Sequence, residues 1–254
     1  MTAVGMRRGA LLRLTPSAGA LAAAAAAEVL ALLEAALAWR GEAHLALAGG
    51  RTPAAMYRRL AEAPFDGWSH VHVWFGDERT VPPDHGDSNY RMARETLLSA
   101  VPIAEAHVHR MAGELEPREA AARYDAALRD LAGDQQRAAP TFDVLLLGMG
   151  ADAHTASLFP GSPLLAPEAR QGDAPAFAAA VHVPSLDAWR LTITPACIAA
   201  ARATLVLVSG GDKQSALRRV LGDEPDLADA PATLLHDVPG DVAWYVDRAA
   251  LFGG

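Results

Sequence analysis

The feature that most constrains the fold of this chain is an alternation of short apolar runs with longer helical patterns along almost its whole length. Such alternation is typical of parallel β-α-β units, because each helix carries the chain back to begin the next strand in the same direction. The predicted strands are Leu11–Leu14, His44–Ala48, Val71–Phe75, His107–Met111, Phe142–Leu147, Phe177–Val183, Leu191–Thr194, Thr204–Val208 and Val242–Val246. The predicted helices are Ala20–Arg40, Pro53–Glu62, Asn89–Leu98, Arg118–Ala132 and Asp212–Leu221. The pattern predicts an α/β fold: a doubly wound, mostly parallel open sheet with helices on both faces, Rossmann-like in plan.

Length and composition favour one domain and exclude several classes of function. A chain of 254 residues with 51% hydrophobic residues can bury a sizeable core, and we expect a single domain over residues 1–254. A net charge of −8 without a basic run predicts no nucleic-acid partner. The single cysteine, Cys197, excludes an internal disulfide and favours a cytoplasmic location.

A basic N-terminal segment precedes the apolar stretch Ala18–Ala27, as in a signal peptide. This stretch consists mainly of alanine, and Glu28 and Glu34 interrupt its continuation. No uncharged apolar run reaches the 18 residues of a membrane span. We therefore expect an ordinary first helix and no membrane partner.

The loop Gly49–Pro53 joins a predicted buried strand to a predicted helix. Two glycines leave the strand, Thr52 is placed to cap the helix, and Pro53 suits the first helical position. Free N–H groups at such a helix start bind anions, most often phosphate, although a plain turn would use the same residues. No Walker motif is present, since no Gly-Lys-Ser/Thr sequence follows.

The segment Gly148–Gly161 follows the most apolar predicted strand and carries candidate catalytic groups. Gly150 allows close approach of the backbone to a ligand, and Asp152 and His154 follow where we expect the next helix to begin. Together they supply a general base and a carboxylate that can orient it. The glycine spacing loosely matches a dinucleotide fingerprint, but Pro160 ends any helix too early for that function. No G-x-S-x-G nucleophile elbow is present.

Other loops after predicted strands are also polar. Asp77, Glu78 and Arg79 follow one strand directly, and Asn89 lies in the next polar segment. Lys213 is predicted in the first turn of a helix, where the macrodipole disfavours a cation unless it faces a bound anion.

Two His-x-His pairs, His70/His72 and His107/His109, would point to one face if they lay on strands. They could begin a zinc site, but no third ligand lies at suitable spacing in the sequence. We expect no metal ion, and we interpret Cys197 as a buried apolar residue.

With these loops in view, the chain resembles the 6-phosphogluconolactonase family over nearly its whole length. The family signature Gly-x-Asp-Gly-His-Thr-Ala-Ser-Leu-Phe-Pro corresponds to Gly150–Pro160, and the family loop Gly-Gly-Ser-Thr-Pro corresponds to Gly49–Pro53. Further matches are Asp77-Glu78-Arg79, Asp87–Tyr90, Arg190–Thr194 and Lys213. Three departures stand out: Ala153 replaces a glycine, Arg51 replaces a serine, and Ser185–Trp189 lacks the family's lysine and prolines.

The resemblance implies hydrolysis of 6-phospho-D-glucono-1,5-lactone in the oxidative pentose phosphate pathway, with no cofactor. His154 is then the general base, oriented by Asp152. The implied substrate- and phosphate-binding residues are Gly49, Gly50, Arg51, Thr52, Asp77, Arg79, Asn89, Gly150, Arg190 and Lys213. We expect a small-molecule phosphosugar lactone as the partner and a monomer or small homo-oligomer.

Two alternatives remain. A non-catalytic sugar-phosphate sensor would keep the phosphate loop and need no base, although Asp152 and His154 are both present. The related glucosamine-6-phosphate deaminases and isomerases carry Asn-Glu where this chain has Leu158 and Phe159. Proton transfer between carbons needs acid and base groups, so these apolar residues favour the lactonase.

Overall fold

The computed structural model describes residues 11–166, 175–222 and 226–253. Its central element is a six-stranded sheet in which every pair of neighbouring strands is parallel. The strands, in order across the sheet, are β1 (Leu11–Thr15), β9 (Asp241–Asp247), β8 (Ala203–Val208), β5 (Val144–Gly148), β2 (Ala43–Leu47) and β3 (Val71–Phe75). Every residue of β2 and β8 is buried, as expected for central strands covered on both faces.

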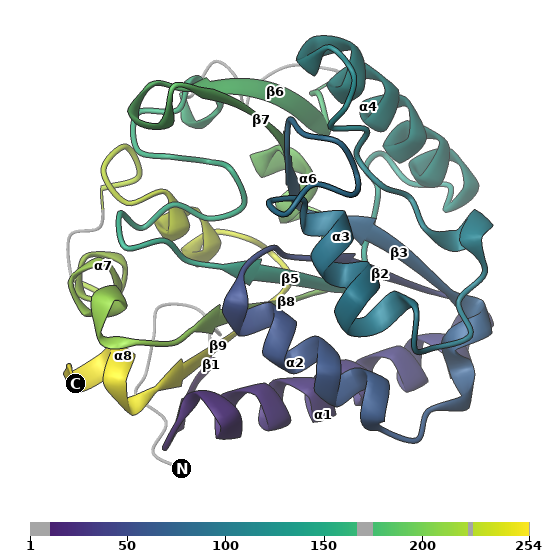
Figure 1. Ribbon diagram of the computed structural model, residues 1–254, viewed down its shortest axis with the longest axis horizontal. Helices are drawn as coiled ribbons and strands as arrows, with labels where there is room; N and C mark the ends of the chain where they lie inside the picture. The colour runs from purple at the N-terminus through teal and green to yellow at the C-terminus, as the bar shows by residue number, and fades with distance from the viewer. Residues whose placement is uncertain (1–10, 167–174, 223–225, 254) are drawn as a thin grey trace.

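Helices cover both faces of this sheet, as predicted (Figure 1). α1 (Ala18–Arg40) and α2 (Arg51–Glu62) lie along one side and pack against each other, whereas α4 (Pro117–Asp134) lies on the other side. The shorter helices are α3 (Asn89–Ala93), which continues as a π-turn over Arg94–Leu98, α6 (Pro195–Ala199), α7 (Gln214–Val220) and α8 (Arg248–Phe252).

A small antiparallel sheet lies on the α4 side and was not anticipated from the sequence (Figure 1). It consists of β4 (Asp77–Arg79), β7 (Ala188–Ile193) and β6 (Ala178–Val183), in that order. Strands were predicted in the regions of β6 and β7, but their antiparallel pairing was not. Asp187 adopts a left-handed conformation (φ 43°) in the tight turn that joins the two strands as a hairpin. The predominantly parallel, doubly wound architecture is nevertheless confirmed.

Two local predictions are wrong. Residues 107–111 do not form a strand: a 3₁₀ turn covers Glu105–His107, and a single bridge joins Val108 to Val73. The histidines leave this segment without a continuous apolar face to bury. No helix follows β5 directly, because Ala153 and Ala156 adopt positive φ values (70° and 47°) and the chain turns instead.

α1 is an ordinary first helix in this fold, as predicted. The Ser17 hydroxyl accepts a hydrogen bond from the Ala20 N–H (3.2 Å), and Gly41 ends the helix at φ 78°. By length and composition alone α1 could also cross a membrane. Leu21, Val29 and Leu33 are fully buried where it packs on the sheet and α2, a pattern shared by core helices of water-soluble proteins. The lack of a membrane partner stays a prediction.

Candidate active site

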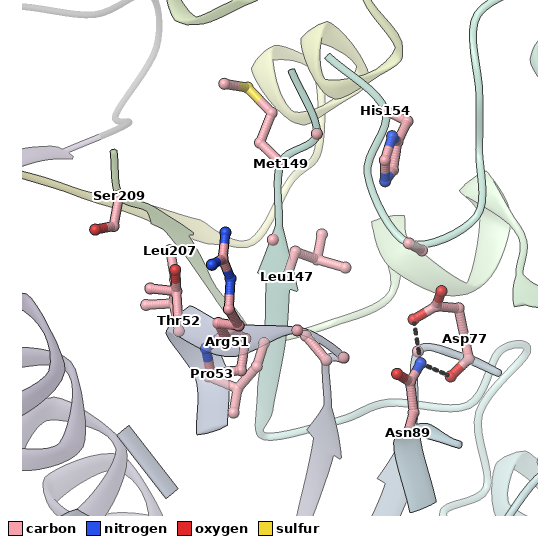
Figure 2. A pocket seen from close by; sticks show the side chains of 18 of the residues that line it. Arg51, Thr52, Pro53, Asp77, Asn89, Leu147, Met149, His154, Leu207 and Ser209 are labelled. Atoms are coloured by element: carbon pink, nitrogen blue, oxygen red, sulfur yellow. Dashed lines mark hydrogen bonds between the residues drawn. The ribbon is translucent and has the colours of Figure 1, made fainter. Parts of the chain in front are cut away.

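The carboxyl ends of β2, β3, β5 and β8 open onto one cleft (Figure 2). This is where ligands bind in open parallel sheets, because the loops that follow the strands converge there. The predicted site residues that line the cleft are Gly49, Gly50, Arg51, Thr52, Asp77, Arg79, Asn89, Gly150, His154 and Lys213. Asp152 and Arg190 line an adjoining hollow, which shares Asp77, Arg79 and His154 with the cleft. The structure therefore brings all of the predicted site residues together.

One end of the cleft is formed by the start of α2. The helix begins at Arg51, one residue earlier than the expected capping residue, and its N-cap is Gly50 at φ 105°. Thr52 therefore does not cap the helix, and Pro53 occupies its third position rather than its first. Because no side chain caps α2, the N–H groups of Arg51 and Thr52 are left for an anion.

The strand end before this loop is held by Tyr57. Its hydroxyl donates to the Ala48 carbonyl (2.8 Å) and accepts from the Ala48 N–H (2.9 Å). Tyr57 is fully buried, and burial raises the pKa of its hydroxyl, which therefore keeps its proton. The turn at Gly49 and Gly50 thus starts from a fixed position.

Gly49 allows a close approach between two loops. A Cβ at this position would overlap the Asn89 side-chain amide. Asn89 donates from Nδ2 to the Asp77 carbonyl (2.8 Å) and to Asp77 Oδ1 (3.2 Å), and it accepts a hydrogen bond from Arg79 (Figure 2). The glycine thereby lets the phosphate loop pack directly on the polar loop after β3.

Glu78 is buried beneath the polar loop after β3 and holds its backbone in place. The residue is 2% exposed and accepts hydrogen bonds from the N–H groups of Arg79, Asn89 and Tyr90 and from the Ser88 hydroxyl. Burial raises the pKa of the Glu78 carboxyl, and the backbone N–H donors partly offset this increase. Sequence reasoning treated Glu78 as part of a charged loop and missed this anchoring role.

Asp152 and His154 form a hydrogen-bonded pair at the edge of the cleft. His154 Nδ1 lies 2.6 Å from Asp152 Oδ1, and the His154 N–H also donates to this oxygen (3.2 Å). Burial alone would raise the pKa of Asp152, but the hydrogen bonds and charge of His154 lower it below its ordinary value. The carboxylate is therefore ionised, and in the neutral imidazole tautomer that donates to it from Nδ1 the lone pair lies on Nε2.

Three neighbours shape this pair. A Cβ on Gly150 would overlap both His154 Nδ1 and Asp152 Oδ1, so the glycine makes room for their contact. The Phe159 ring stacks on the imidazole, with centroids 4.2 Å apart. Ala153 occupies the left-handed region, where a glycine would be unstrained, yet its methyl group is completely buried and the pair still forms.

The backbone of Gly150 is tied to the pair as well: the Gly150 N–H donates to the His154 carbonyl (2.9 Å). This N–H is therefore already engaged in the fold. Gly150 contributes space for the pair rather than a free donor.

Cationic side chains lie at both sides of the site. Lys213 lines the cleft and contacts Asp212 (3.1 Å), while Arg51 extends from the start of α2 into the cleft (Figure 2). Arg79 and Arg190 face each other across β4 and β7. Burial and the neighbouring charge of Arg79 lower the pKa of Arg190.

Ser157 was missed as a site residue, although it lies within the same signature segment. Its hydroxyl donates to Asp77 Oδ2 (2.8 Å), which joins the loop after β5 to the loop after β3. This role depends on the folded contact, since Ser157 and Asp77 lie far apart in the sequence.

The His-x-His pairs lie away from the cleft. His72, His107 and His109 stack along the outer side of β3, and His44 on β2 lies beside His72. Among residues 11–166, 175–222 and 226–253, no group of three His, Cys, Asp or Glu side chains is placed to hold a metal ion. Cys197 is buried, as predicted.

The family model, the curated relatives and the solved structures all match this chain to the same protein family. The model of the family described as glucosamine-6-phosphate isomerases/6-phosphogluconolactonase matches residues 16–244. A 6-phosphogluconolactonase of Synechocystis sp. is 38% identical over 217 residues, which cover 85% of this chain and 86% of that protein. The solved 6-phosphogluconolactonase of Trypanosoma brucei superposes with a TM-score of 0.82 at 29% identity, covering 96% of this chain and 98% of the other. A glucosamine-6-phosphate deaminase with 21% identity and a TM-score of 0.76 shares the fold, with 94% and 98% of the two chains covered.

Proposed function

Because the chain belongs to the glucosamine-6-phosphate isomerase/6-phosphogluconolactonase family, we propose that it hydrolyses 6-phospho-D-glucono-1,5-lactone to 6-phospho-D-gluconate. The observation that carries this proposal is the contact between His154 Nδ1 and Asp152 Oδ1 at the edge of a cleft that also contains an uncapped helix start. The names of the relatives support a hydrolase that acts on a lactone ester.

In this proposal His154 acts as the general base. Its Nε2 takes a proton from water as the water oxygen attacks the lactone carbonyl carbon. The tetrahedral intermediate then collapses, the bond between the carbonyl carbon and the ring oxygen breaks, and the ring oxygen receives the proton back from Nε2. Asp152 holds the Nδ1–H throughout and stabilises the imidazolium. A positioned base contributes roughly 10²–10⁴-fold to the rate.

The phosphate provides the binding energy that orients the ring. The free N–H groups at Arg51 and Thr52 and the cationic side chains of the site supply charge-assisted hydrogen bonds to anionic oxygens. Because these groups are held by the fold, binding the phosphate places the carbonyl carbon near His154 without a further entropic cost at the chemical step.

The experiment that tests the function compares the native chain with His154→Ala on freshly generated lactone, with EDTA present and the spontaneous rate subtracted. We expect fast native turnover, loss of at least 100-fold in the variant and retained binding of 6-phosphogluconate. Binding of 6-phosphogluconate by the native chain without any acceleration would favour the sensor. Equal turnover by the two proteins would reject His154 as the base.

The biological setting belongs to the same proposal. The reaction would place the protein in the oxidative pentose phosphate pathway, and the single cysteine favours the cytoplasm. A monomer or small homo-oligomer without nucleic-acid partners stays a prediction, as does the single domain over residues 1–254.

A further inference from the structure

A group of arginines lies at the opposite end of the sheet from the cleft. Arg40 ends α1, Arg137 follows α4, and Arg202 directly precedes β8. These arginines gather at the amino ends of β2, β5 and β8, whereas the cleft lies at the carboxyl ends of the same strands. β8 has six residues, so at about 3.3 Å per residue roughly 20 Å separate the two ends. The group is therefore distinct from the candidate active site.

This group carries more positive charge than its one buried carboxylate balances. Asp143 is 5% exposed and contacts both Arg40 and Arg202, whose Nε lies 3.2 Å from Asp143 Oδ1. No described carboxylate lies within 4.0 Å of Arg137. Burial and the charges of Arg40 and Arg137 lower the pKa of Arg202, and Asp143 offsets only part of this decrease. Like charges held together in this way favour a bound anion.

Two further acids border the group without neutralising it. Glu42 is exposed and lies toward His44, with 3.5 Å between Oε1 and Nε2. Asp241 is exposed at the start of β9. Neither carboxylate comes within 4.0 Å of an arginine of the group, and water and salt screen charges that are exposed. The excess positive charge therefore remains.

Arg137 and Arg202 line an open hollow of about 370 Å³, which is large enough for a small molecule. Most of its other walls are alanines from the loops before β5 and β8, together with Pro239 and Gly240 before β9. A Cβ on Gly240 would overlap the Ala201 carbonyl oxygen, so the glycine lets the loop before β9 pack directly on the loop before β8. The fold thus holds the walls of the hollow in place.

Trp39 lies beside these arginines, and its side chain is left open to solvent. The residue is 70% exposed, and the guanidinium carbons of Arg40 and Arg202 lie 4.7 Å and 5.1 Å from the centroid of its ring. Because both guanidiniums also contact the same oxygen of Asp143, they cannot cover opposite faces of the indole. Cation–π contacts therefore support one face of the ring, and the other face is free.

We propose that Arg137, Arg202 and Trp39 form a binding site for a nucleoside phosphate. The two guanidiniums bind the phosphate oxygens in the hollow through charge-assisted hydrogen bonds. The base stacks on the open face of Trp39, as bases do on exposed aromatic side chains. An inorganic anion would leave Trp39 without a contact, and an uncharged ring compound would leave the arginines unbalanced. The site is independent of the proposed function, since it shares no lining residue with the cleft.

The test is a calorimetric titration with ATP in EDTA at 0.15 M salt. Adenosine supplies the ring without the charge, and tripolyphosphate supplies the charge without the ring. The variants are Arg137→Gln and Trp39→Ala, because both side chains are exposed and their replacement should leave the fold intact, which urea unfolding checks.

Two variants serve as controls. Arg118→Gln changes another exposed arginine whose guanidinium lies over an indole, that of Trp189 (5.9 Å), outside this site. Lys213→Ala removes a cation from the cleft and reports any ATP that binds there instead.

We expect saturable binding of one ATP per chain. Arg137→Gln should weaken it about 10- to 100-fold, as for loss of a charged hydrogen bond. Trp39→Ala should weaken ATP about 5- to 100-fold, as for loss of base stacking, and tripolyphosphate by less than about 3-fold. Adenosine and tripolyphosphate should each bind at least about 10-fold more weakly than ATP. Arg118→Gln and Lys213→Ala should bind ATP like the native chain.

Absence of saturable ATP binding would overturn the proposal. Tripolyphosphate binding as tight as that of ATP would also overturn it, because Trp39 would then have no role. Loss of ATP binding in Lys213→Ala, with native binding in Arg137→Gln, would place the nucleotide in the cleft and reject this site.

Discussion

Replacing Gly150 with alanine should disable the proposed base while leaving the fold largely intact. The added Cβ would lie well inside 3.0 Å of His154 Nδ1 and Asp152 Oδ1, closer than Cβ atoms come to other atoms in proteins. Both side chains are partly exposed (31% and 46%), so we expect them to swing toward solvent rather than distort the core. The pair would then lose its contact and the imidazole its orientation.

The magnitudes separate activity from stability. Loss of a positioned base costs roughly 10²–10⁴-fold in rate, which corresponds to about 3–5 kcal/mol of barrier. Overpacking typically costs about 1–3 kcal/mol of unfolding free energy, and the lower part of that range applies here because the displaced groups can reach water. The loss of turnover should therefore exceed what the loss of stability explains.

The assay measures lactone hydrolysis above the spontaneous rate, together with urea unfolding of the same preparations. Gly133→Ala is the matched control: it lies in the last turn of α4, a Cβ there meets nothing within 4 Å, and alanine should stabilise the helix by about 0.5–1 kcal/mol. If Gly150→Ala kept a kcat within about threefold of the native value, the close contact would not matter for catalysis, and the reasoning from this geometry would be refuted.

Three further predictions follow from the surroundings of the site. Tyr57→Phe should lower the unfolding free energy by about 2–4 kcal/mol, because the buried N–H and C=O of Ala48 lose their hydrogen-bond partner. Tyr124→Phe is the control: it removes the partner of the Phe75 N–H and C=O in the same way and should cost as much stability. Only the Tyr57 variant should raise KM. Burial and neighbouring imidazoles lower the pKa of His72 and of His109 from 6.5 to about 4, so unfolding by urea should become easier as the pH falls from 6.5 toward 4. His109→Gln should reduce that pH dependence of the unfolding free energy. Ala153→Val should cost at least about 2 kcal/mol and lower kcat, because a β-branched residue is strained at φ 70°, whereas thermal unfolding of Ala153→Gly should differ little from that of the native chain.

The parallel sheet could be predicted because its strands are buried on both faces and read as continuous apolar runs. β2 and β8 are the clearest examples. β4 could not be predicted in this way, since Asp77, Glu78 and Arg79 resemble a solvated loop. They form a strand because β7 supplies a partner and the loop's own N–H groups satisfy buried Glu78, and both conditions are tertiary.

The site could be predicted as a set of loops but not as a set of contacts. The rule that ligands bind beyond the carboxyl ends of parallel strands was sufficient to group residues as distant as Gly49 and Lys213. The sequence did not indicate that Gly49 makes room for Asn89 or that Gly150 makes room for His154, because each overlap is fixed by how two turns pack.

The strand order also constrains how the protein is made. β1, the first strand, pairs with β9, the last, and α1 packs against β9 as well as against β2. About 200 residues separate the end of α1 from the start of β9. At a synthesis rate of about 5–20 residues per second, this long, alanine-rich helix waits roughly 10–40 s for its last partner strand. Throughout that interval the part of α1 that β9 will cover is a target for chaperones and for aggregation, and removing the final strand would leave that part exposed permanently.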